Sequence, residues 1–168
     1  MNHIFKMVKL ITSRALIKQQ EKIACLEKKM TELEQGVGAA TSQGHETWHD
    51  NAGFDIAVHE VRIHDVRLSD AYRVLDEAKL AEYPHKVGTD VSYGTRVIFL
   101  RDGKRMDIQI VGYCDANPDR DRILYESPLA KALYDHHIGE VFNVPINGIL
   151  SNFKIEQVLP ITDTDLLE

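Results

Sequence analysis

A heptad repeat near the N-terminus constrains the fold of this chain more than any other feature. From about residue 12 to residue 43, apolar residues recur every seven positions in two rows. The first row is Leu16, Ile23, Met30 and Val37, and the second is Leu26, Leu33 and Ala40, with Gln19 as its polar first member. This spacing predicts one long helix whose apolar seam must be covered by another helix.

A second helical segment can provide that cover. After Gly44, apolar residues at a three-and-four spacing predict a helix; they are Phe54, Val58, Val61, Leu68, Tyr72 and Leu75, with Asp65 as the polar exception. Further apolar residues widen this stripe and predict burial on more than one side near the base: Ile56, Ile63, Val66 and Val74. Two such helices joined by a polar link predict an antiparallel coiled-coil hairpin, with a piece of helical bundle as the alternative.

The pattern changes to a period of two after Tyr83-Pro84. Positions 87–100 are rich in β-branched and aromatic residues, and a turn is predicted at 101–104. A strand follows in which Met106, Ile108 and Ile110 alternate with polar residues. Ser127-Pro128 predicts a short helix to about residue 134, and Asn147-Gly148 predicts a hairpin between 141–146 and 149–158. The fold class is therefore α+β, with a hairpin over residues 1–83 and a small antiparallel-sheet domain over 84–168.

Composition and charge exclude several classes of protein. The chain is 43% hydrophobic and 27% charged, which favours a globular protein, and its net charge of -6 argues against binding nucleic acid by charge alone. No apolar run approaches the roughly 20 residues that span a bilayer. Cys25 and Cys114 lie far apart, as suits reduced thiols. We expect a cytoplasmic protein that binds neither membranes nor free nucleic acid and has no cofactor of its own.

Charge is distributed unevenly along the predicted hairpin. Residues 6–29 carry seven Lys or Arg against two acids, whereas no Lys or Arg occurs between Met30 and Val61. That second stretch contains six acids: Glu32, Glu34, Glu46, Asp50, Asp55 and Glu60. An acidic tip on a long arm suits delivery of carboxylates to a metal ion or contact with a basic surface. The alternative is that these acids only stabilise the N-terminus of the returning helix.

Trp48, the single tryptophan, lies in the link between the two predicted helices. It suits an anchor that enters a pocket of a partner protein, or a plug over the end of the seam. His45 and His49 are four residues apart, but no third ligand follows at a clear spacing, so a zinc site is not expected.

Three segments resemble the GreA/GreB family of transcript-cleavage factors, and the resemblance extends over nearly the whole chain. The segments are His49–Phe54, which is similar to the family's acid-Asn-Ala-acid-Tyr signature; Val91–Val97 followed by Ile110–Gly112; and Ser127–Leu133 followed by Gly139–Val144. The Ser-Pro-Leu-x-x-Ala-Leu block in the third segment is the most specific of the three.

The resemblance implies an FKBP-like C-terminal domain that docks on the rim of the secondary channel of bacterial RNA polymerase, and a hairpin that enters the channel. The tip carboxylates would help to hold a second Mg²⁺ and an attacking water beside a backtracked transcript. Carboxylates provide the hard oxygen ligands that Mg²⁺ prefers. Because the polymerase itself cuts the RNA, the chain would be a factor and not an enzyme. We also expect it to be a monomer.

The tip departs from the family pattern. Asp50 matches the second family acid, but the first acid aligns with Thr47, which cannot ionise. Glu46 is adjacent and is predicted to take its place, four residues from Asp50. Gly53 and Phe54 stand where the family has an acid and a tyrosine. Two functions therefore stay open: stimulation of transcript cleavage, and regulation or inhibition of polymerase by a channel binder without cleavage.

The resemblance also implies partner contacts. We expect Trp48 and Asn51 to contact polymerase at the tip, and Ser127, Pro128 and Leu129 to contact it at the sheet domain, with Asp115 as a further candidate. Leu129 and Leu133 could instead be core residues, and we expect this of Leu133. A third hypothesis is a prolyl isomerase or chaperone, whose aromatic pocket would come from Tyr93, Phe99, Tyr113, Tyr125, Tyr134, Phe142 and Phe153.

Overall fold

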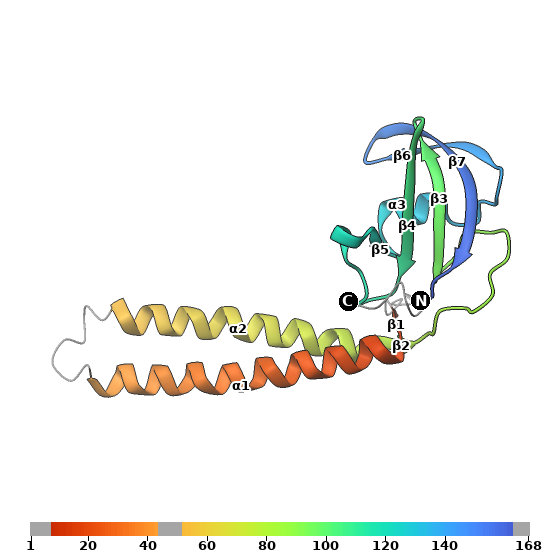
Figure 1. The fold of residues 1–168 in the computed structure, drawn as a ribbon. Helices are drawn as coiled ribbons and strands as arrows, with labels where there is room; N and C mark the ends of the chain where they lie inside the picture. Colours follow the sequence, from red (N-terminus) through yellow and green to blue (C-terminus); the bar gives the residue numbers. More distant parts are fainter. Residues whose placement is uncertain (1–7, 44–51, 163–168) are drawn as a thin grey trace, which may run out of the picture. The chain divides into compact units, whose positions relative to one another are not determined.

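Two long helices come first along the chain and a five-stranded sheet comes second (Figure 1). The structure is a computed structural model that describes residues 8–43 and 52–162. Its elements are β1 (Lys9–Ile11), α1 (Ser13–Gln43), α2 (Ala52–Asp76), β2 (Ala78–Leu80), β3 (Thr95–Arg101), β4 (Lys104–Val111), a 3-10 turn (Pro118–Arg120), β5 (Arg122–Leu124), α3 (Pro128–Leu133), β6 (Val141–Ile146) and β7 (Ile149–Pro160). The predicted α+β class is confirmed.

The chain divides into two units. Residues Leu16–Ala78 form the helical unit, and residues Val8–Ala15 join residues 79–162 in the sheet unit. This division differs from the predicted 1–83 and 84–168, because β1 is hydrogen-bonded within the sheet unit. The Tyr113 N–H donates to the Leu10 carbonyl at 2.9 Å, and the Ala81 N–H donates to the Ile11 carbonyl at 3.0 Å. A three-residue strand is too short to show a period in the sequence.

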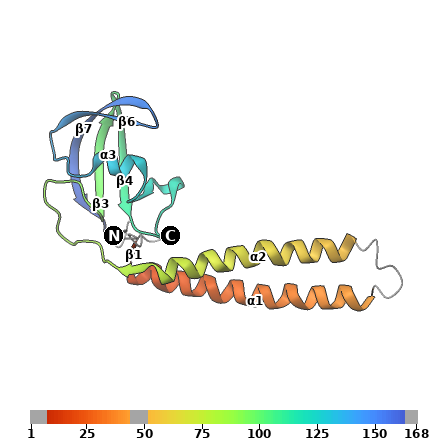
Figure 2. The same cartoon turned by 180° about the vertical axis from the view of Figure 1, so that it is seen from behind.

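The hairpin seam on α1 lies where the heptads predict it. Ile23 is buried, and Leu16, Leu26, Leu33 and the other apolar members described are half-buried, whereas most residues between them are exposed. The two helices lie side by side in both views (Figures 1 and 2). The seam follows from the spacing, because residues seven apart return to the same face of a helix that packs against another.

On α2 the predicted seam needs two corrections. His64 and Ala71, which are 7% and 4% exposed, occupy the inner positions, and the predicted Asp65 and Tyr72 are exposed. A small alanine and a hydrogen-bonded histidine both fit between closely packed helices, although neither counts as a large apolar residue. The predicted widening of the stripe is wrong, because it placed inside three side chains that are exposed: Ile56, Ile63 and Val66.

Two buried polar side chains join the helices. Gln19 Nε2 donates to the Ala71 carbonyl at 2.9 Å, and His64 Nε2 lies 2.8 Å from the Leu26 carbonyl, to which it can only donate. A polar group buried without a partner costs about 1–3 kcal/mol. Sliding one helix along the other would break both contacts, so these two residues fix the register of the hairpin.

The sheet has the strand order β5-β4-β3-β7-β6. All neighbouring pairs are antiparallel except β4 and β5, which run parallel, so the sheet is mixed and not wholly antiparallel as predicted. Both predicted hairpins are confirmed. Their turns, Asp102-Gly103 and Asn147-Gly148, have positive φ at both residues, which matches the twist of the paired strands.

The core of the sheet unit lies between the sheet and α3. Its fully buried members come from β3, β4, β7 and α3, and include Phe99, Ile110, Leu133, Phe153 and Ile155. Burying a side chain of this size stabilises the fold by about 1.5–3 kcal/mol. The sheet and α3 therefore form the frame on which the loops of this unit are positioned.

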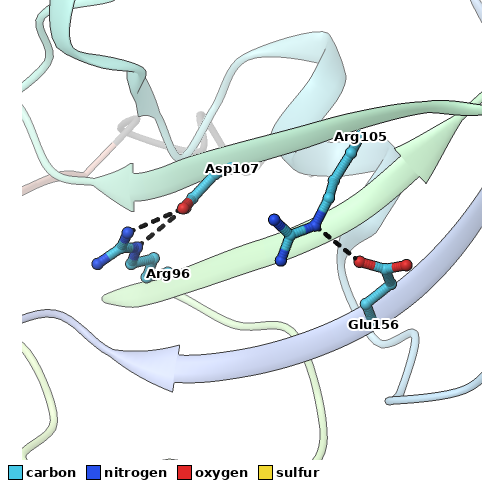
Figure 3. A network of polar contacts seen from close by, with 4 residues as sticks. All are labelled: Arg96, Arg105, Asp107 and Glu156. Carbon is cyan, nitrogen blue, oxygen red and sulfur yellow. Dashed lines mark hydrogen bonds and ion pairs between the residues drawn. The ribbon is translucent and has the colours of Figure 1, made fainter.

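Charged pairs cross the strands of the sheet (Figure 3). Arg96 on β3 donates two hydrogen bonds to Asp107 on β4, at 2.9 and 2.8 Å, and Arg105 on β4 lies 3.1 Å from Glu156 on β7. These pairs are exposed or half-exposed, so each contributes about 0–1 kcal/mol. They mark a solvated region of the sheet.

The first residues of α1 are held by two acceptors. Thr12 Oγ1 accepts from the Ala15 N–H at 3.1 Å, which is the geometry of a helix N-cap. Glu82 accepts from both the hydroxyl and the backbone N–H of Ser13, the latter at 2.8 Å. These bonds, the hydroxyl first, hold the pKa of Glu82 below its ordinary value.

α1 contains two glycines in its interior, Gly36 and Gly38. Nothing lies within 4 Å of the position that a Cβ would take at Gly36 or Gly38. Because glycine costs a helix about 0.5–1 kcal/mol relative to alanine, we expect Gly36→Ala and Gly38→Ala each to raise the free energy of unfolding by about that amount. Denaturant unfolding followed by circular dichroism measures it. Gly103→Ala, at a φ of 82°, should destabilise instead; a loss of stability in the helix variants would contradict this account.

The contact between Glu82 and Ser13 predicts a dependence of stability on pH. Because the folded-state pKa of Glu82 is lowered, its contribution is present above the unfolded value of 4.5 and is lost as pH falls through the folded value. We expect Glu82→Gln to lower stability by less than about 1 kcal/mol at neutral pH, since the site is exposed, and to lose its effect in acid. Chemical denaturation at several pH values tests this, with Glu60→Gln as the control.

Candidate functional site

The Ser-Pro-Leu block forms a capped helix start, as predicted. Ser127 is the N-cap of α3, and its side chain accepts from the Ala130 N–H at 3.2 Å. Pro128 follows at the first helical position, where its missing N–H costs nothing. The helix ends at Leu133, with Tyr134 as the C-cap. This cap fixes where α3 begins within the sheet unit.

The side chains of this block differ in availability. Pro128 is exposed, Leu129 is half-buried and packs against the core, and Leu133 is fully buried. The prediction that Leu133 belongs to the core is confirmed. The hydroxyl of Ser127 is already used as the cap. Pro128, with the outer part of Leu129, is therefore the accessible part of this block.

Asp115 lies inside the sheet unit and not on a docking surface. It is 7% exposed, and its Oδ2 accepts from Thr12 Oγ1 at 3.0 Å and from the Tyr83 hydroxyl at 2.7 Å. Its prediction as a partner contact is corrected: the carboxylate holds the segment that leads into α1. The sequence could not show this, because Thr12 is 103 positions away along the chain.

Tyr83 completes the arrangement around Asp115. Its hydroxyl also accepts from the Gly112 N–H at 3.0 Å, and burial raises the pKa of Tyr83 well above its ordinary value. A Cβ at Gly112 would lie 2.7 Å from the Leu10 carbonyl oxygen. Glycine is therefore required at this position because β1 passes directly against it.

Two further tyrosines, Tyr113 and Tyr125, contact residues 8–12, and a third, Tyr93, contacts Ala81, which is hydrogen-bonded to Ile11; sequence reasoning missed this role. The Tyr93 hydroxyl donates to the Ala81 carbonyl at 2.8 Å, and the Tyr125 hydroxyl lies 3.0 Å from the Val8 carbonyl. The Tyr125 ring packs edge-on against the rings of Tyr93 and Tyr113. We call Tyr83, Tyr93, Tyr113, Tyr125 and Asp115 the β1 clamp. The sequence shows only dispersed tyrosines, which no spacing connects.

The aromatic residues proposed for a proline pocket are engaged in packing, and Tyr134 packs against the core. Tyr93, Tyr113 and Tyr125 belong to the β1 clamp. Phe99 and Phe153 are fully buried, and Phe142 stacks between Phe153 and His136. This division leaves the isomerase hypothesis without structural support.

The tip residues Glu46, Trp48, Asp50 and Asn51 lie outside the described residues. The neighbouring helix ends are described: α1 ends at Gln43 and α2 begins at Ala52, with Asp55 in its first turn. At 1.5 Å per residue, the 25 residues of α2 span about 37 Å.

Across residues 8–43 and 52–162, no three His, Cys, Asp or Glu side chains are grouped as a metal site would require. In the same ranges, no helix is long and apolar enough to cross a membrane.

Comparison with known proteins identifies relatives of the chain. A sequence model described as "Transcription elongation factor, GreA/GreB, C-term" matches residues 86–160. The transcription elongation factor GreA of Thermomicrobium roseum is 34% identical over 116 residues, which cover 67% of this chain and 73% of the relative. GreA of Clostridium novyi is 26% identical over 153 residues, covering 89% and 94%.

A solved structure, GreA factor homolog 1 of Thermus thermophilus, is 19% identical, covers 90% of this chain and 98% of its own, and superposes with a TM-score of 0.44. The sequence matches, and not this superposition, decide the assignment. Because the similarity to the Thermomicrobium factor extends over most of that protein and the C-terminal model matches residues 86–160 of the sheet unit, the chain belongs to the GreA/GreB family of transcription elongation factors.

Proposed function

We propose that this protein binds the secondary channel of bacterial RNA polymerase and stimulates cleavage of backtracked transcripts. The active site of the polymerase cuts the RNA, and the factor supplies groups to it without being an enzyme. Membership of a family of transcription elongation factors supports the partner. The hairpin and its acidic link support the mechanism.

One observation carries the proposal: the two helices of the hairpin end at Gln43 and Ala52, on either side of the segment that contains Glu46 and Asp50. A helix pair about 37 Å long can carry these carboxylates into a narrow channel that a globular domain could not enter. The buried contacts of Gln19 and His64 keep the two helices in register.

The charge around the tip suits this task. No Lys or Arg occurs between Met30 and Val61, so no cation close in sequence neutralises Asp50 and Glu46. Their carboxylates would offer hard oxygen ligands to a Mg²⁺ held jointly with the polymerase, where the ion lowers the pKa of a bound water. Trp48 and Asn51 would contact the polymerase beside them.

The sheet unit would dock on the rim of the channel. Pro128 is exposed at the start of α3, and the Ser127 cap holds it in a defined position. Leu129 packs partly against the core, so a contact here would rest on a rigid base. A rigid contact surface loses little entropy when it binds.

A second candidate function is regulation of polymerase without cleavage. Thr47 favours it, because the residue at the first acid position of the family cannot ionise. A channel binder of this kind would slow initiation or elongation and produce no shortened transcripts.

Removal of the Asp50 charge tests the main proposal. We expect Asp50→Asn to reduce the rate of RNA cleavage in an arrested elongation complex by about tenfold or more, because a metal ligand is lost. Binding to polymerase should not change. Asp55→Asn, in the exposed first turn of α2, is the matched control and should cleave like the unmodified protein. Normal cleavage by the Asp50 variant would refute the mechanism.

The role of Glu46 can be tested with Thr47. We expect Glu46→Gln to reduce cleavage, and addition of Thr47→Asp to restore it, because the second change returns a carboxylate to the family position. Transcript lengths from an arrested complex give the measurement. If the unmodified protein yields no shortened transcripts yet slows elongation, the second candidate function is the correct one.

A further inference from the structure

α2 carries an apolar stripe on the side away from the hairpin seam. Ile56, Ile63 and Val66 are 60%, 42% and 61% exposed. Seven residues separate the first two and three separate the last two, so all three lie along one face, as the members of a second seam would. We call these three residues the outer stripe.

The stability of the helix does not explain the outer stripe. β-Branched side chains lose rotamer freedom in a helix and are poorer helix formers than Ala, Leu, Glu or Lys. Exposed positions of α2 could carry any of those residues at lower cost. Three β-branched aliphatic residues in line on a solvated face are typical of a surface that another helix covers.

We propose that the outer stripe packs against the outer stripe of a second copy of this chain, with the two α2 helices antiparallel. In this arrangement Ile63 of each copy lies against Val66 of the other, across a two-fold axis. The contact is self-complementary, as a symmetric dimer requires. The inferred dimer contact does not rest on the proposed function.

Charges beside the outer stripe select the antiparallel register. With Ile63 opposite Val66, Glu60 of each copy flanks Arg67 of the other, which gives two pairs of opposite charge. A shift by one heptad in either direction would instead place Glu60 against Glu60 or Arg67 against Arg67. Only the proposed register pairs opposite charges along this flank.

The same charges disfavour a parallel arrangement. Parallel helices with matched stripes would bring Asp55 of one copy beside Glu60 of the other, and Arg62 beside Arg67. Both contacts join like charges. Charge complementarity therefore favours one orientation as well as one register.

The ends of the contact make the dimer weak. His59 would lie against Asp70, and Ile56 would lie against the aliphatic part of Arg73. On the other flank the same register places Arg62 of each copy beside Ser69 of the other, so no opposite charges pair there. With two apolar layers and charge pairs on one flank only, the interface falls at the small end of specific contacts. We therefore expect a monomer in dilute solution and a dimer at high concentration.

Sedimentation velocity of the full chain, over a series that reaches millimolar concentration, tests the outer stripe. We expect the unmodified protein to shift from monomer to dimer, and Ile63→Lys and Val66→Lys to remain monomeric. Ile17→Lys is the matched control, because Ile17 is an equally exposed isoleucine on α1, at 57%, and its variant should still dimerise. Dimerisation of the Ile63 and Val66 variants would overturn the proposal.

A charge exchange tests the register. Glu60→Arg and Arg67→Glu should each weaken association by about tenfold, because two attractive pairs become repulsive. An equal mixture of the two variants, or the double variant, should associate like the unmodified protein. Failure of both to recover would overturn the antiparallel arrangement. An unmodified protein that is monomeric at every concentration would overturn the dimer, and a loss of polymerase binding by Ile63→Lys would then assign the outer stripe to polymerase.

Discussion

The hydrogen bonds at Asp115 are the contact on which the start of the hairpin depends. Thr12 and Tyr83 both donate to one carboxylate oxygen, and the Thr12 hydroxyl also caps α1. A buried hydroxyl without an acceptor costs about 1–3 kcal/mol, so the two donors depend on this single acid. Because β1 passes close to Gly112, that position has no room for a side chain. The clamp thus joins cap, strand and sheet in one polar network.

Packing along the hairpin weakens from its base towards its link. From the base to the middle of the hairpin Ile23, His64 and Ala71 are buried, whereas nearer the link Val37 and Val58 are only half-buried beside a cavity of about 290 Å³. The stability of a local segment follows the apolar contacts that it buries. The register of the hairpin is therefore set near the base, and the distal turns follow it. In the proposed mechanism, a carboxylate delivered by the hairpin would depend on contacts far from the chemistry.

Sequence reasoning predicted the parts of the fold that have a period or a turn signature. The heptads placed α1, Ser127-Pro128 placed α3, and Asn147-Gly148 placed the last hairpin. It failed where the deciding contact is distant in sequence or too short for a period: β1, β5 and the burial of Asp115. It misplaced the phase of α2 because the inner residues His64 and Ala71 are not large apolar groups. The roles of Glu46, Trp48, Asp50 and Asn51 stay predictions.

The two candidate functions share the described fold and differ only in what the link between the helices does. The sheet unit, which the family model matches over residues 86–160, carries the proposed docking surface, and the proposed chemistry lies in the link between α1 and α2. Because these features belong to different units, a change at Thr47 can alter catalysis without altering the capped helix at Ser127 or the β1 clamp. A cleaving factor and a non-cleaving regulator can then share every described contact of this structure. The distinction between them reduces to whether Glu46 can do the work of a carboxylate one position away.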